Sequence, residues 1–144
     1  MEYKATYAHV VKIGESLKIS DNLWKIIKSD QGTESGPGPV EAMLLVCSKE
    51  MKQLFLFPIK NKNYKIVKIL CELEELTPSF VQDITEEISD FEMEKVHVTG
   101  VTTNEEGLLV FEGYYSCETI DTGQLEKNIS SHPTVTTCVV EIVK

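Results

Sequence analysis

The sequence predicts an α+β fold, because alternating apolar residues and helical apolar stripes follow one another with turn or cap residues between them. From Lys65 to Lys144 the order is strand, helix, strand, strand, helix, strand. Two helices and four strands in that order predict a ferredoxin-like sandwich, in which both helices cover one face of an antiparallel sheet. A smaller strand-rich region precedes it.

The first strand of this unit is predicted over residues 65–74. Its alternation places Val67, Ile69, Cys71 and Leu73 on one face, which belongs in the core. The next helix has a clear start, because Thr77 is a good N-cap and Pro78 suits the first helical position, where no amide donor is needed.

An apolar stripe defines the buried side of that helix. Phe80, Ile84 and Ile88 recur at helical spacing, with Val81 beside them. In the strand that follows, Val96 and Val98 are predicted to point one way, and Lys95, His97 and Thr99 the other. A turn over residues 103–107 then leads into a strand over 108–117.

The last helix and strand are predicted from caps and β-branched residues. Asp121 and Gln124 have the spacing of a capping box, and Leu125 and Ile129 would face inward. His132 and Pro133 end this helix, and residues 134–143 are β-branched enough to predict the final strand.

The first 63 residues read as an α+β extension. Strands are predicted over 3–13, 41–47 and 53–59, the last two as a hairpin. A short helix is predicted over 21–28, with Trp24 beside its apolar stripe. Residues 30–39 form a Gly/Pro-rich loop, either a connector or a lid. The polar turn at 61–63 is the best boundary, which divides the chain into domains 1–63 and 64–144.

Composition excludes several functions. The formal charge is −9, with +2 over residues 1–64 and −11 over residues 65–144, and all fourteen basic residues are lysines. Nucleic acid is therefore not expected as a partner, because phosphate binding depends on clustered basic residues. No apolar run reaches the roughly 18 residues of a membrane helix, and no signal peptide is apparent, so we expect a cytoplasmic protein that does not enter a membrane.

Catalytic and metal patterns are missing from the sequence. The four cysteines are scattered without a CxxC pair, which predicts buried reduced thiols rather than a metal site or a disulfide. No nucleophile elbow surrounds a serine, and His9, His97 and His132 stand in unrelated contexts. No cofactor is predicted, and His97 is expected to be an ordinary surface residue or to line a pocket or dimer interface.

Residues 64–144 resemble the ACT domain family, a small βαββαβ module. The resemblance rests on residues 73–84, which look like the family's first strand, proline loop and first helix, and on residues 88–98 and 129–135. It implies a regulatory domain that senses amino acids or other small metabolites, often by pairing in oligomers. Ser79 stands where the family has glycine, and Glu92 where asparagine is common.

A ligand site is predicted at the start of the first helix. Its residues are Glu75, Leu76, Thr77, Pro78, Ser79 and, from the resemblance, Glu92. First-turn amides carry partial positive charge and suit a carboxylate or phosphate, Ser79 adds a hydroxyl, and the glutamates at 74 and 75 suit an ammonium group. The alternative is that Thr77 merely caps the helix.

Function is therefore expected to be regulatory rather than catalytic. We expect a small-molecule effector, such as an amino acid, that binds near residues 75–79 and controls the oligomeric state of a homodimer. The alternatives are a protein–protein interaction subunit without a small ligand, and a small enzyme that uses His97 or Cys117 under the Gly/Pro-rich loop.

Overall fold

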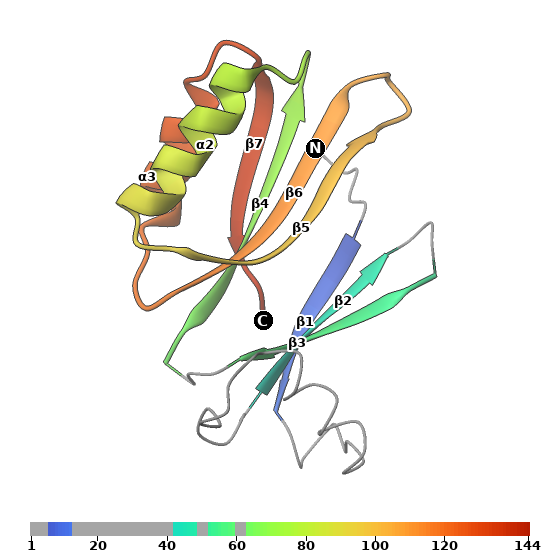
Figure 1. Cartoon of the computed structure of the whole chain (residues 1–144), viewed down its shortest axis with the longest axis vertical. Coiled ribbons are helices and arrows are strands. Elements are labelled where there is room, and N and C mark those ends of the chain that lie inside the picture. Colours follow the sequence, from blue (N-terminus) through green and yellow to red (C-terminus); the bar gives the residue numbers. More distant parts are fainter. Residues whose placement is uncertain (1–5, 13–41, 49–51, 60–62) are drawn as a thin grey trace.

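The computed structural model describes residues 6–12, 42–48, 52–59 and 63–144. Within these residues the chain forms two antiparallel sheets and two helices (Figure 1). The helix expected over 21–28 and the loop expected over 30–39 lie outside this part of the chain. Neither of the two described helices has the length and apolar character that crossing a bilayer would demand.

The first sheet has the order β1-β2-β3 and comes from the N-terminal region. Its strands are β1 (Thr6–Lys12), β2 (Ala42–Ser48) and β3 (Leu54–Ile59), each antiparallel to its neighbour. The predicted hairpin is confirmed, because β2 and β3 pair from Ala42 with Ile59 to Cys47 with Leu54. Pro58 lacks an amide donor, which this strand tolerates because β3 lies at the sheet edge.

The second sheet has the order β5-β6-β4-β7. Along the chain, one helix connects β4 to β5 and the other connects β6 to β7. Its elements are β4 (Lys65–Leu73), α2 (Pro78–Asp90), β5 (Glu94–Thr103), β6 (Leu109–Cys117), α3 (Thr122–Ser130) and β7 (Val135–Ile142). The expected order of elements is confirmed, and the arrangement is consistent with a ferredoxin-like α+β fold. The change from one sheet to the other falls between Ile59 and Lys65.

One core lies between the second sheet and the two helices. The predicted inward face of β4 is buried there, together with Phe80, Ile84 and the partly buried Ile88 of α2 and the apolar stripe of α3. The members of this core include Val67, Ile69, Cys71, Leu73, Phe80, Ile84, Leu125 and Ile129. The expectation that Val81 shares this buried stripe is wrong, because its side chain is 49% exposed on the adjoining helix face. Local periodicity identified this layer because α2, α3 and the alternating residues of β4 each turn one apolar face toward it.

The alternation predicted for β5 is wrong at its start. Val96 packs against the cluster between the two sheets, whereas Val98 packs against the helix-facing core. The register with β6 shifts between Lys95 and His97 and again between Val98 and Gly100. Each bulge adds a residue to one strand only, so the side chains that follow change face.

A second buried layer joins the two sheets, whose strands form separate groups in Figure 1. Leu44, Val46 and Ile59 from the first sheet pack against Ile66 and Tyr114 from the second. The apolar run of β3 is therefore covered on one side by the C-terminal half of the chain. Burial on both faces also explains why residues 66–71 of β4 are all buried.

His97 belongs to this second layer. Its ring stacks on Phe55 and Phe57, with centroid distances of 5.4 and 4.8 Å, and lies 6.4 Å from the ring of Tyr114. Desolvation lowers the pKa of His97 from its ordinary value. The expectation of an ordinary surface histidine is wrong, because β1–β3 cover the sheet face toward which it points.

Buried polar groups fasten β1 to the second sheet. The Thr6 amide donates to Glu112 Oε2 at 3.1 Å, and the Thr6 hydroxyl contacts the same oxygen and lies 2.6 Å from Tyr114 Oη. Lys68 Nζ donates to the Thr6 carbonyl at 2.8 Å and lies 3.4 Å from Glu112 Oε2. Lys68 and Glu112 are only 2% and 1% exposed, so their charges depend on these partners.

Candidate functional site

The start of α2 is fixed by the predicted cap. Thr77 has extended backbone angles, and its hydroxyl accepts a hydrogen bond from the Phe80 amide at 3.2 Å. The Val81 amide donates to the Thr77 carbonyl at 3.3 Å, and Pro78 is the first helical residue. Two first-turn amides are therefore used within the helix end itself, which confirms the capping role of Thr77.

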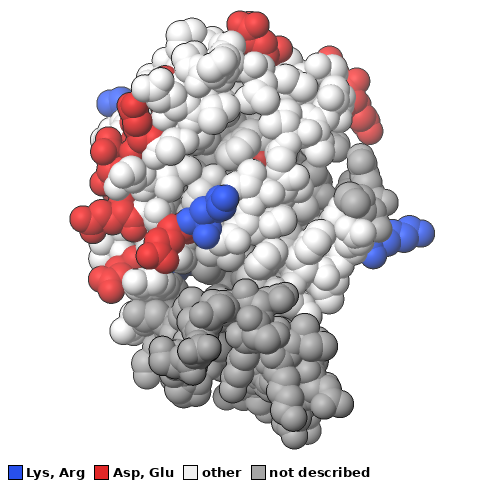
Figure 2. All heavy atoms as spheres, viewed as in Figure 1, with Lys and Arg blue, Asp and Glu red and all other residues white. Residues whose placement is uncertain are grey.

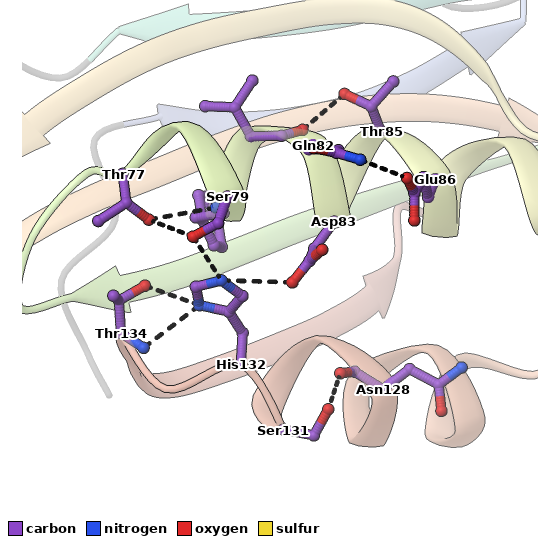
Figure 3. A network of polar contacts seen from close by, with 12 residues as sticks. Thr77, Ser79, Gln82, Asp83, Thr85, Glu86, Asn128, Ser131, His132 and Thr134 are labelled. Carbon is purple, nitrogen blue, oxygen red and sulfur yellow. Dashed lines mark hydrogen bonds and ion pairs between the residues drawn. The ribbon is translucent and has the colours of Figure 1, made fainter.

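A chain of polar contacts runs from this helix start to the end of α3 (Figure 3). Thr77 Oγ1 lies 3.0 Å from Ser79 Oγ, which lies 3.4 Å from His132 Nε2. The same nitrogen lies 3.3 Å from Asp83 Oδ2. In Figure 3 Ser79 and Asp83 both point from α2 toward the His132 ring. The two helices are thus joined by one imidazole.

The orientation of His132 is set by β7 and by the core. Thr134 donates its backbone N–H to His132 Nδ1 at 3.2 Å, and its hydroxyl lies 2.8 Å from the same atom. The ring also meets Phe80 edge-on, with a centroid distance of 5.5 Å. Only 7% of the His132 side chain is exposed. This contact network holds the ring in one position.

The hydrogen bonds of His132 exclude a Ser-His-Asp triad here. Because Nδ1 accepts the Thr134 amide proton, the neutral ring carries its own proton on Nε2, the atom that faces Ser79 and Asp83. A catalytic histidine needs an unprotonated nitrogen toward the serine and the carboxylate on the opposite nitrogen. Here both partners share one nitrogen, so Ser79 cannot be activated in this arrangement.

A pocket opens beside this network, between α2 and α3. Its volume is about 110 Å³. Apolar side chains form part of its lining, and carboxylates and polar groups form the rest. The lining residues are Phe80, Asp83, Ile84, Glu86, Glu87, Asn128, Ile129, Ser131 and His132. We call this cavity the α2–α3 pocket.

The polar lining of the α2–α3 pocket is ordered by short contacts between side chains. Asn128 Nδ2 donates to Glu87 Oε2 at 3.0 Å, which connects the two helices across the pocket. Gln82 Nε2 donates to Glu86 Oε1 at 2.9 Å. Acidic side chains also gather along the side of the molecule where α2 and α3 lie (Figures 1 and 2). The pocket therefore has a negative surrounding field.

The residues predicted for the ligand site are not all in one place. Glu75, Leu76, Thr77, Pro78 and Ser79 lie together before and at the first turn of α2, and all but Thr77 are exposed. None of them lines the α2–α3 pocket, although Ser79 contacts its His132 wall. Their role as ligand contacts stays a prediction.

Glu92 lies at the other end of α2. The helix has 13 residues. At about 1.5 Å per residue it separates Glu92 from Pro78 by roughly 20 Å. Glu92 lines a different cavity of about 250 Å³, together with Tyr64, Asp90, Phe91, Glu94, Ser116, Cys117, Glu118 and Thr119. The structure therefore does not bring Glu92 to the helix start.

Backbone geometry gives Glu92 a local role. Its φ is +52°, in the left-handed region. Its amide donates to the Ser89 carbonyl, and the Met93 amide donates to the Ile88 carbonyl, both at 3.0 Å. This pair of hydrogen bonds is a Schellman motif, in which the left-handed residue ends the helix. Asparagine and glycine favour that conformation, so Glu92 is an unusual residue for this position.

Several residues of the site were not singled out by sequence reasoning. No role is predicted for Asp83 from the sequence, and His132 is predicted only to end α3. The spacing of Ser79 and Asp83 did place them on one helix face, but His132 follows Ser79 by 53 residues. The contact depends on how α3 and β7 return beside α2, and no local pattern reports that.

Comparisons with known proteins do not assign a family. No family model matches the chain, and no curated protein matches it. Solved structures that match include a chain described as "Chemotaxis kinase CheA P2 domain in complex with response regulator CheY", from the thermophile Thermotoga maritima. The identity is 17%, the TM-score is 0.43, and the match covers 56% of this chain and 99% of that chain. At this score the likeness does not bear on function.

Proposed function

We propose that this chain is a non-catalytic regulatory module that binds a small cationic metabolite in the α2–α3 pocket. The observation that carries the proposal is the lining, in which Asp83, Glu86 and Glu87 stand beside apolar side chains. No lysine is among the described residues that line it. Carboxylates beside apolar side chains favour an ammonium group with a short hydrocarbon part, such as a simple amine or the ammonium end of an amino acid whose carboxylate faces solvent.

The size of the pocket supports a small group. A volume of about 110 Å³ is well below the several hundred Å³ typical of sites for drug-sized ligands. The ammonium end of a metabolite and a few carbons would fill it, while the remainder of the ligand would face solvent. We therefore expect charge-assisted hydrogen bonds to the α2 carboxylates to provide most of the binding free energy.

An organic cation fits the carboxylates better than a metal ion does. In the described part of the chain, no group of three or more His, Cys, Asp or Glu side chains converges as a metal site. Divalent cations need several oxygens at short, fixed distances, whereas an ammonium group can donate hydrogen bonds to carboxylates that do not converge on one point. The bound species we propose is accordingly an amine.

We extend the proposal to fold and assembly. The strand order β5-β6-β4-β7 with α2 and α3 on one face supports a ferredoxin-like, ACT-like domain. Both β5 and β7 are edge strands, and exposed edges are commonly paired across a two-fold axis. We propose that the ligand acts by shifting an equilibrium between monomer and homodimer.

The test is a binding screen on the folded chain. Thermal shift measurements with the common L-amino acids and with short primary amines and diamines should give a concentration-dependent rise for at least one amine. Sodium chloride at matched ionic strength is the control, because nonspecific screening would act equally for every salt. Sedimentation velocity with and without the active compound measures the assembly step separately. A panel without any stabilising amine would refute ligand binding.

One observation favours a second function, the binding of another protein. Leu76 and Val81 are large apolar residues at the start of α2, and they are 47% and 49% exposed. Acidic residues at 74, 75 and 83 surround them in sequence. A partner with an apolar anchor and lysines or arginines around it would match this surface. Leu76→Ser/Val81→Ser should weaken a protein partner but leave amine binding unchanged, which separates the two functions.

A further inference from the structure

Two buried cysteines face each other in the second sheet. Cys71 of β4 and Cys138 of β7 are direct partners in the antiparallel ladder. Their Sγ atoms are 3.4 Å apart, and both thiols are free. Cys71 is fully buried and Cys138 is 6% exposed, within the core below α2 and α3.

The backbone at this position already suits a disulfide bond. Residues directly opposite in an antiparallel pair have Cα atoms about 4.5–5.5 Å apart, and disulfides span about 4.4–6.8 Å. Closing the 3.4 Å separation of the sulfurs to a bond of about 2.05 Å requires side-chain rotation and no exchange of strand partners. Cys47 and Cys117 lack this relation, because Cys47 is in the first sheet and Cys117 pairs with Lys65.

We propose that Cys71 and Cys138 form a two-electron redox site, which a hydroperoxide converts to an intrachain disulfide that joins β4 to β7. Cys138 attacks first, because it is on an edge strand and Cys71 is on an inner one. Its thiolate displaces hydroxide from hydrogen peroxide and becomes a sulfenic acid. The Cys71 thiol then attacks that sulfur, and water leaves. In sum, two thiols and one peroxide give one disulfide and two waters.

The chemistry explains which cysteine must react first. The hydrogen bond to Cys138 and burial raise the pKa of the Cys71 thiol far above its ordinary value. Cys71 is therefore a poor initial nucleophile, and it serves as the resolving thiol once an electrophilic sulfur is beside it. Opening of the β7 edge would limit the rate of the first step.

The bond would act on the part of the fold that carries the α2–α3 pocket. The chain runs from the end of β4 through Thr77 into α2, and β7 begins three residues after His132. These two ends are already joined by a hydrogen bond from the Glu74 amide to the Thr134 carbonyl at 3.0 Å. A disulfide between the same strands would tighten this junction. The redox site itself stands independently of the proposed ligand.

Peptide mapping tests the proposal directly. Cleavage after lysine places the cysteines in four separate peptides, 29–49, 69–95, 96–127 and 128–144. The folded chain is treated with hydrogen peroxide, quenched with acid, denatured, alkylated and digested. We expect a linked species of 69–95 with 128–144, two mass units below the sum of the free peptides. Alkylatable thiols should fall from four to two per chain.

Matched variants make the result specific. Cys47→Ser/Cys117→Ser should form the same linked species, and Cys138→Ser should form none. If Cys138→Ser does not fold, the comparison is made on the wild-type chain with and without urea during oxidation. The proposal is overturned if 69–95 and 128–144 remain unlinked in the folded chain while other cysteines oxidise. It is equally overturned if they become linked only in urea.

Discussion

Replacing Glu92 by glycine should stabilise the fold. Glu92 ends α2 with φ at +52°, and it accepts this conformation because its own amide and the Met93 amide complete the helix end. A residue with a Cβ pays about 1–2 kcal/mol in the left-handed region. Glycine avoids that cost but loses about 0.5–1 kcal/mol through its more flexible unfolded state. The expected net gain is about 0.5–1 kcal/mol.

The assay is chemical and thermal unfolding of Glu92→Gly beside Glu92→Ala. Alanine removes the same carboxylate but keeps the Cβ, so it controls for the side chain. For a chain of 144 residues the gain corresponds to a rise of about 1–4 °C in the midpoint. If Glu92→Gly is no more stable than Glu92→Ala, the assignment of Glu92 as the left-handed residue of a Schellman motif is wrong.

The same pair of variants tests the location of the ligand site. Glu92 lies about 20 Å along the helix from Pro78 and outside the α2–α3 pocket. Amine affinity should therefore be the same in Glu92→Gly, Glu92→Ala and the wild type. Loss of amine affinity in both variants would indicate that Glu92 contacts the ligand, as predicted from the sequence.

Three further perturbations test the packing. Gly113→Ala should lower the free energy of unfolding in urea by about 1–3 kcal/mol, because a Cβ at Gly113 would lie 2.6–2.9 Å from the buried ring and hydroxyl of Tyr115. An unchanged free energy of unfolding would refute that close approach. Lys68→Met should cost about 3–5 kcal/mol by removing the ammonium group 3.4 Å from the buried Glu112 carboxylate, and the double variant with Glu112→Leu should recover much of this. Equal instability of both variants would argue against charge burial as the cause. Partial burial lowers the pKa of His97, so the unfolded chain binds a proton first as pH falls through about 6.5, and stability should fall with it. His97→Phe should lose this part of the pH dependence, and an unchanged pH profile would contradict the partly buried position.

The elements of the C-terminal half could be predicted because local rules decide them. Thr77 caps α2 and Pro78 begins it, since both effects act within one turn of helix. Asp121 caps α3 by accepting the Gln124 amide at 2.9 Å, as the capping box predicts. The Gln124 side chain departs from that motif, because it donates to Asn128 at 2.6 Å. One half of the box is sufficient to begin the helix.

What the sequence could not supply depends on contacts between distant residues. Lys68 looks like a solvent-facing residue in an alternating strand, yet the first sheet covers it and Thr6 and Glu112 bind it. The bulges in β5 depend on how it pairs with β6, so Val96 and Val98 could not be assigned to faces from alternation alone. Tertiary covering overrides the local pattern in both cases.

In the candidate site, too, the local features could be predicted and the contacts between distant residues could not. Sequence reasoning located the start of α2 and its polar residues, because a helix start has a recognisable local pattern. It did not locate the α2–α3 pocket, whose His132 and Asn128 come from the end of α3. The polar contacts that join Ser79, Asp83 and His132 exist only because α3 returns beside α2.

The most direct test is calorimetric titration of the folded chain with the amine that the screen selects. Asp83→Asn/Glu86→Gln should weaken binding by about 100-fold or more, because two charge-assisted hydrogen bonds of about 1.5–3 kcal/mol each are lost. Glu105→Gln/Glu106→Gln, on the exposed turn between β5 and β6, makes the same change in charge and should bind as the wild type does. Equal weakening in both double variants, or no change in either, would contradict recognition of the ligand in the α2–α3 pocket.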